Sequence, residues 1–157
     1  MLLTGTFVRA LDDKQRFAIP KRLRDAMLDS PGKKLFMTRG TDASLAIYTE
    51  EVLAGVAQRM AAASPVQQDV RDFQRLFYAQ AEQLDVDSQG RVRIPPALAQ
   101  LAGVSKEIVL LGVLDHLELW DRSRWESYLA ERTGQYDALA VRAFDAGQSP
   151  PVVSTSK

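Results

Sequence analysis

An internal repeat constrains the fold of this chain more than any other sequence feature. Residues 11–20 (Leu-Asp-Asp-Lys-Gln-Arg-Phe-Ala-Ile-Pro) align with residues 86–95 (Val-Asp-Ser-Gln-Gly-Arg-Val-Arg-Ile-Pro), and residues 45–49 align with 117–121. The residues that recur 75 positions later are Asp12, Arg16, Ile19, Pro20 and Leu23, as Asp87, Arg91, Ile94, Pro95 and Leu98. A period this long does not fit a solenoid. It predicts one duplicated module.

The two copies predict the same order of elements. Each is expected to begin with a strand, a tight turn at the Asp-x-x-x-Arg motif and a short returning strand, which form a two-stranded ribbon. Pro20 and Pro95 then favour the first turn of a short helix. Two more strands and a closing helix follow, with Thr49 and Asp121 as N-caps. The expected strands are 5–11, 16–19, 34–39 and 44–48 in the first copy, and 79–86, 91–94, 108–113 and 117–120 in the second.

Helical periodicity is visible in three places. The expected apolar stripes are Leu53, Val56, Ala57 and Met60 in the first closing helix, and Trp125 and Leu129 in the second. Between the copies, Ser64-Pro65-x-Gln67 matches a capping box with proline at the first helical position. The helix that it starts would carry Val66, Val70, Phe73 and Phe77 on one face.

The expected organisation is therefore two repeats and a tail. The first repeat spans 5–54, inter-repeat helices span 55–78, the second repeat spans 79–132, and 133–157 is a disordered tail, with at most a frayed helix over 134–144. One copy is too small to bury much surface, so two copies are expected to complete one barrel-like core. The predicted fold class is α+β and β-rich, with internal pseudo-two-fold symmetry.

Composition excludes several kinds of function. The chain has no cysteine, which rules out disulfides and thiolate metal sites. Its apolar runs are short and its N-terminus lacks a signal-peptide layout, so we expect a soluble cytoplasmic protein without a membrane span. The sole histidine, His116, stands beside Asp115, and no glycine-rich phosphate loop or cluster of metal ligands is present. We expect neither an enzyme nor a cofactor, metal or small-molecule substrate.

Charge distinguishes the two copies, although the whole chain has a net charge of zero. Residues 9–24 hold six basic and two acidic side chains, a net charge of +4, whereas the matching residues 84–99 hold two of each. A local basic patch is what the phosphates of nucleic acid attract. The first copy is therefore the candidate DNA-binding copy. Its basic residues are Arg9, Lys14, Arg16, Lys21, Arg22 and Arg24.

Two interpretations of the Asp-x-x-x-Arg turn remain open. The Arg16 guanidinium has the fork of donors that suits guanine, and Gln15 could bind adenine. Alternatively the motif is a structural brace, in which aspartate accepts turn N–H groups and arginine bonds back to it. We expect bracing from Asp12 and Asp87, and bracing or direct DNA contact from Arg91. Gly90 favours a positive φ in its turn, so Gln15 at the matching position implies backbone strain or a different turn.

The two motifs in this order resemble the MraZ family, whose members are tandem SpoVT/AbrB-like domain proteins. The resemblance covers about residues 1–132 and includes Thr38-Arg39-Gly40, Leu111-Gly-Val113 and Leu117-Glu-Leu-Trp120 followed by Trp125. The chain departs from the family at Gln15, where glycine is common.

The resemblance implies a double-split β-barrel fold and a ring-shaped homo-oligomer. It further implies a nucleoid-associated regulator that binds short direct repeats in double-stranded DNA and represses its own division and cell-wall gene cluster. Carried over by position, the DNA-binding residues are Arg16, Lys14, Gln15, Arg9, Lys21, Arg22 and Arg24. The alternative is a protein-binding module of the kind found in AbrB-like antitoxins, and that function would require a separate partner-binding tail.

Overall fold

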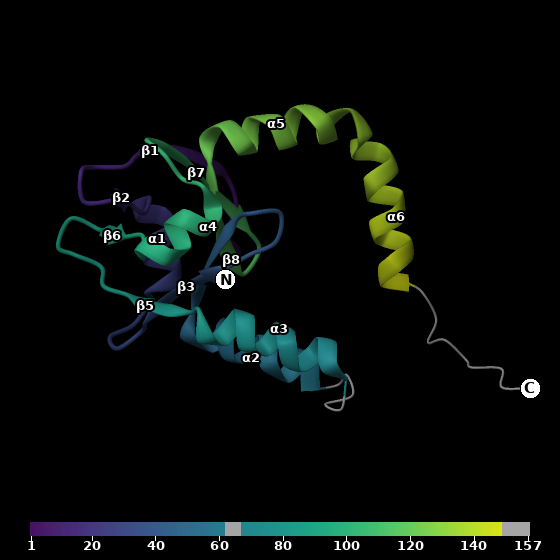
Figure 1. Cartoon of the computed structure of the whole chain (residues 1–157), viewed down its shortest axis with the longest axis horizontal. Helices are drawn as coiled ribbons and strands as arrows, with labels where there is room; N and C mark the ends of the chain where they lie inside the picture. The colour runs from purple at the N-terminus through teal and green to yellow at the C-terminus, as the bar shows by residue number, and fades with distance from the viewer. Residues whose placement is uncertain (62–66, 149–157) are drawn as a thin grey trace, which may run out of the picture. The chain divides into compact units, whose positions relative to one another are not determined.

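The computed structural model describes residues 1–61 and 67–148, and it divides into two units, Met1–Arg122 and Ser123–Lys157. The strands all belong to the first unit (Figure 1). They are β1 (Thr6–Ala10), β2 (Arg16–Ala18), β3 (Leu35–Arg39), β4 (Leu45–Thr49), β5 (Glu82–Leu84), β6 (Arg91–Arg93), β7 (Glu107–Val113) and β8 (His116–Asp121). The helices are α1 (Lys21–Met27), α2 (Glu50–Ala61), α3 (Gln68–Ala79), α4 (Pro96–Ala102), α5 (Arg122–Arg132) and α6 (Tyr136–Gln148).

The strand order shows the pseudo-two-fold symmetry that the sequence predicts. The larger sheet has the order β1-β7-β8-β4-β3-β5, and exchanging each strand for its counterpart in the other copy returns the same order reversed. All of its ladders are antiparallel. Only the β3–β4 and β7–β8 hairpins lie within one copy. The predicted α+β class and duplicated module are confirmed.

The expected ribbon within each copy is wrong. β1 pairs with β7 of the other copy, and β2 pairs with β6, its counterpart, in a separate two-stranded sheet. The turn at Asp12 to Arg16 therefore joins two different sheets. Alternation identified the strands because it reports which face is buried, but it does not specify which strand is the hydrogen-bonded neighbour.

One hydrophobic core joins the two sheets and the short helices. Phe17 of β2 and Val92 of β6 face each other across the small sheet and are only 2% and 1% exposed. The core continues through Ile19, Leu23, Leu35, Ile47, Ile94, Leu98, Ile108, Leu110, Leu117 and Leu119. Both copies supply matching positions, so the prediction of a shared core is confirmed.

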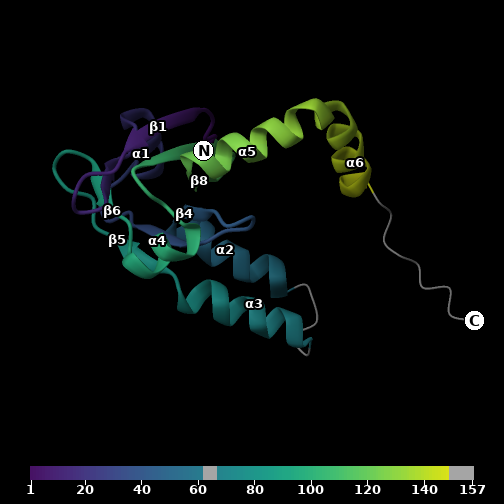
Figure 2. The same cartoon turned by 45° about the horizontal axis from the view of Figure 1, so that its top comes forward.

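Helices α2 and α3 lie side by side next to the larger sheet (Figures 1 and 2). The Thr49 hydroxyl accepts a hydrogen bond from the Val52 N–H at 3.3 Å, which confirms the predicted N-cap of α2. The predicted start of α3 is wrong, because its N-cap is Gln67 and Gln68 is its first residue. Ser64, Pro65 and Val66 lie outside the described residues, as does the Met60 side chain.

Other boundaries differ from the predictions by a few residues. Ala79 is the last residue of α3, so the strand expected over 79–86 shrinks to Glu82–Leu84.

Gly103 ends α4 in the left-handed conformation, which satisfies the carbonyls of the last turn. Asp121 precedes α5, and its carboxylate accepts hydrogen bonds from the Ser105 N–H and hydroxyl, both at 3.1 Å.

The described part of the second unit is helical, so the disordered tail expected over 133–157 is wrong as far as Gln148. α5 continues through a short 3-10 turn, Thr133–Gln135, into α6. The sequence of α6 is rich in alanine, a strong helix former, and this composition outweighs the absence of a buried face. Leu129 is 46% exposed, so the stripe predicted in α5 does not form a buried face there. Across both described segments, no helix has the length and apolar character to cross a membrane.

Candidate nucleic-acid interface

The first Asp-x-x-x-Arg turn is organised by the Asp12 carboxylate. Its Oδ1 accepts hydrogen bonds from the backbone N–H groups of Lys14 and Arg16, both at 2.9 Å. Its Oδ2 accepts a hydrogen bond from Nε of Arg16 at 2.8 Å. Backbone bonds from Gln15 N to Asp12 O and from Asp12 N to Arg16 O, both 3.0 Å, close the turn. The Arg16 N–H, the Arg16 side chain and the Lys14 N–H all lower the pKa of Asp12.

The second turn has the same geometry. Asp87 accepts the N–H groups of Gln89 and Arg91 at 2.9 Å and Nε of Arg91 at 2.9 Å. Chiefly because of the Arg91 N–H bond, the pKa of Asp87 is lowered like that of Asp12. The bracing geometry expected of Asp12, Asp87 and Arg91 is therefore present in both copies, and Arg16 shares it. The brace alone does not distinguish a DNA-binding turn from its duplicate.

Gln15 and Gly90 occupy the same backbone conformation, with φ of 60° and 77°. Of the two alternatives for Gln15, the structure shows the same turn with a strained residue in it. A Cβ atom at Gly90 would lie 1.3 Å from Nη1 of Arg24 on α1, whose guanidinium covers that turn. The position in α4 that matches Arg24 is Ala99. The large Arg24 on α1 therefore goes with the small Gly90 in the second turn. In the matching positions, the small Ala99 on α4 goes with the larger Gln15 in the first turn.

The two turns project side by side from one end of the first unit (Figures 1 and 2). Backbone bonds tie each turn to the opposite copy, from Ile19 N to Gly90 O at 3.1 Å and from Ile94 N to Gln15 O at 3.0 Å. Nη1 of Arg91 lies 4.0 Å from Oδ2 of Asp12. A ligand at this end would therefore meet both turns.

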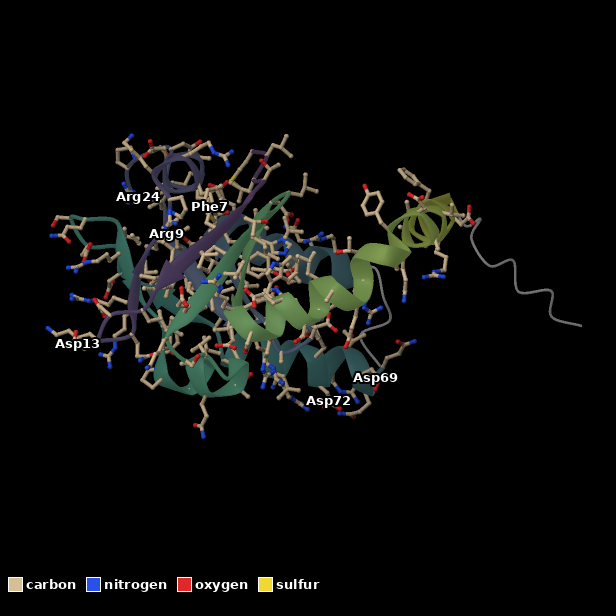
Figure 3. All side chains as sticks on the ribbon, turned by 90° about the horizontal axis from the view of Figure 1, so that it is seen from above. Phe7, Arg9, Asp13, Arg24, Asp69 and Asp72 are labelled. Carbon is tan, nitrogen blue, oxygen red and sulfur yellow. The ribbon has the colours of Figure 1, made fainter. Side chains whose placement is uncertain are left out.

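Arg9 and Arg22 flank one aromatic ring on β1, that of Phe7. Both guanidinium carbons lie 5.8 Å from the centroid of Phe7, and Arg22 also donates to the Thr4 carbonyl at 3.0 Å. Figure 3 shows Phe7 and Arg9 near α1, with Asp13 at the tip of the first turn. Packing on the ring fixes these two cations in place and leaves their charge available.

The remaining predicted residues differ in how free their charge is. Lys21 forms an ion pair with Asp25 at 2.7 Å, which reduces its pull on a phosphate. Arg24 donates to the Ile19 carbonyl at 3.4 Å and packs over Gly90. Lys14 is exposed, and its ammonium has no ion-pair partner within the described segments. Arg16 and Lys21 each share their charge with an aspartate, whereas no ion pair joins Lys14, Arg9, Arg22 or Arg24 to a carboxylate among the described residues.

Sequence reasoning missed Arg93. Its strand pairing places it directly opposite Arg16, and its side chain is exposed. The linear charge count hid it, because Asp85 and Asp87 lie nearby in the sequence. Only the β2–β6 register, which the sequence does not predict, brings it to the first turn.

The one His–Asp contact lies elsewhere, on a cavity of about 340 Å³ beside α3. His116 Nδ1 lies 2.8 Å from Asp115, and its ring stacks on Tyr48 with centroids 5.1 Å apart. Hydrogen bonds and charge from Glu118 and Asp115 raise the pKa of His116, although partial burial of the ring acts to lower it. No group of three potential metal ligands accompanies this pair within the described residues.

Comparison with known proteins gives a consistent result. The family model described as "MraZ protein, putative antitoxin-like" matches twice, at residues 2–76 and 77–146. Transcriptional regulator MraZ of Moorella thermoacetica is 35% identical over 92% of this chain and 98% of its own length. The protein of that name from Corynebacterium urealyticum is 39% identical over 89% and 95%, and that from Cutibacterium acnes is 40% identical over 81% and 87%.

Proposed function

The chain belongs to the MraZ family, and on that premise we propose that it is a transcriptional regulator that binds duplex DNA. The observation that carries the proposal is the pair of braced turns that project from one end of the first unit (Figure 1), with exposed Lys14 in the first turn and Arg16 opposite Arg93 beside it. Phosphate contacts from Arg9, Lys14 and Arg22 would position the protein. Arg16, with Nε held by Asp12, would present its remaining N–H donors to base edges or phosphates.

We propose repression of its own division and cell-wall gene cluster as the regulatory outcome, with the protein acting as a ring-shaped homo-oligomer on short direct repeats. In such a ring, each subunit offers one pair of turns, and several weak contacts raise affinity through effective concentration. A promoter fragment with several repeats in phase should therefore bind far more tightly than a fragment with one repeat. Equal affinity for the two fragments would contradict the ring, whose subunit number can be measured by sedimentation.

The direct test is binding to the duplex upstream of the chain's own gene, followed by fluorescence anisotropy. Arg16→Ala should weaken binding by about fivefold to a hundredfold, the range for loss of a well-made base contact. Arg91→Ala should weaken binding less, because the tip of its turn carries the neutral Gln89 where the first turn carries Lys14. Arg75→Ala is a matched control, since Arg75 is exposed on α3 and pairs with Asp72, which Figure 3 shows far from Asp13 of the first turn. Equal losses from Arg16→Ala and Arg91→Ala, or no loss from either, would overturn the assignment to the first copy.

An antitoxin-type protein-binding function is the second candidate. The second unit supplies a feature that favours it, because Tyr136 and Phe144 on α6 are each 72% exposed. A chain ending at Arg132 separates the two functions. The DNA-binding proposal expects this shortened chain to keep full affinity for promoter DNA, whereas an antitoxin-type function expects it to lose a protein partner that co-purifies with the full chain.

A further inference from the structure

The outer face of the β2–β6 sheet carries three arginines drawn from both repeats. In this antiparallel pair Arg16 is opposite Arg93, and Arg91 is opposite Ala18. Directly opposite residues share a face, and successive residues alternate between faces. Phe17 and Val92 take the buried face, so Arg16, Arg91 and Arg93 share the other one.

The charges on this face are not balanced. Nε of Arg16 is bound by Asp12, and Nε of Arg91 is bound by Asp87. For Arg93, the described part of the chain provides no carboxylate partner. Like charges directly opposite each other on a sheet destabilise it. A short two-stranded sheet that keeps such a pair is well suited to an anion from outside the chain.

We infer that Arg93 contacts the phosphate backbone of the bound DNA, so that the binding surface is built from both repeats. The inference rests on the proposed function and extends it to a residue outside the Asp-x-x-x-Arg motif. A phosphodiester beside β2 and β6 would neutralise the Arg16–Arg93 repulsion as it binds. The contact would add affinity to any sequence, because phosphates carry no base information.

The test compares Arg93→Ala, Arg93→Lys and the control Arg75→Ala by fluorescence anisotropy over a series of salt concentrations. Promoter duplex and an unrelated duplex of equal length serve as probes. Arg93→Ala should weaken binding to both duplexes by a similar factor, about fivefold per bound subunit near physiological salt. The slope of log affinity against log salt should become shallower by about 0.9 per bound subunit. Arg93→Lys, which keeps the charge, should retain the slope.

The outcomes separate the inference from the function on which it rests. If Arg93→Ala and Arg75→Ala both bind like the wild type while Arg16→Ala is weakened, the inference is overturned and DNA binding stands. A loss confined to the promoter duplex, with an unchanged salt slope, also overturns it. If the wild type itself shows no salt-dependent binding to either duplex, the proposed function fails. Thermal unfolding of each variant verifies folding, and Arg93→Ala should not be less stable, because it removes a like-charge pair.

Discussion

Individual residues explain why duplicated turns need not behave alike. Gln15 has the positive φ that its duplicate gives to glycine, a conformation that costs a non-glycine residue about 1 kcal/mol or more. We expect Gln15→Gly to raise the free energy of unfolding by about 1 kcal/mol, measured by urea denaturation. Gln15→Asn should give a smaller gain, since asparagine tolerates this region better. No gain from Gln15→Gly would show that the turn relaxes around Gln15.

Gly90 and Arg24 form a coupled pair in the structure. Gly90→Gln should lower the free energy of unfolding by about 1–3 kcal/mol, because it adds backbone strain and displaces the Arg24 guanidinium. Arg24→Ala on that background, which copies the Gln15–Ala99 arrangement, should recover the part of the loss due to crowding. A double-mutant cycle measures the coupling. Strictly additive effects would mean that Arg24 moves aside without loss.

At the scale of elements, the start of β8 should give stability a dependence on pH. The folded-state pKa of His116 lies above its ordinary value of 6.5, because Glu118 and Asp115 favour the imidazolium. Its contribution is therefore fully present below pH 6.5 and is lost as the pH rises through the folded-state pKa. Since His116 is the sole histidine, unfolding free energies measured between pH 6 and 8 should fall in the wild type. His116→Gln should flatten that dependence, and an unchanged slope would contradict the assignment.

Elements also show what the sequence could predict. The two Asp-x-x-x-Arg turns and most strands follow from local rules such as proline placement, carboxylate bonding to turn N–H groups and alternation of apolar residues. The partners of the strands do not, because pairing joins segments that are distant in sequence. For this reason the predicted β1–β2 ribbon is wrong, and the position of Arg93 opposite Arg16 was not predicted. α6 was expected only as a frayed helix over 134–144, whereas in the structure it continues to Gln148.

For the whole molecule, interleaving makes the two repeats depend on each other. The ladders β1–β7, β2–β6, β3–β5 and β4–β8 all cross between copies. A fragment of residues 1–76 should therefore not fold as a monomer. Its circular dichroism should show no cooperative melting at low concentration, and mixing it with residues 77–157 should restore the transition. A fragment that melts cooperatively as a monomer in sedimentation experiments would contradict this expectation.

The cross-pairing of β1 also sets a delay during synthesis on the ribosome. Ala10 at the end of β1 pairs with Glu107 at the start of β7, which is made 97 residues later. At elongation rates of about 5–20 residues per second, the nascent chain holds β1 as an open edge for roughly 5–20 seconds. β2 waits for β6 in the same way, with Phe17 uncovered. Open edges invite pairing with neighbouring chains. On a polysome those neighbours are further copies of this same chain, so misassembly between nascent chains is the hazard that the duplicated architecture carries.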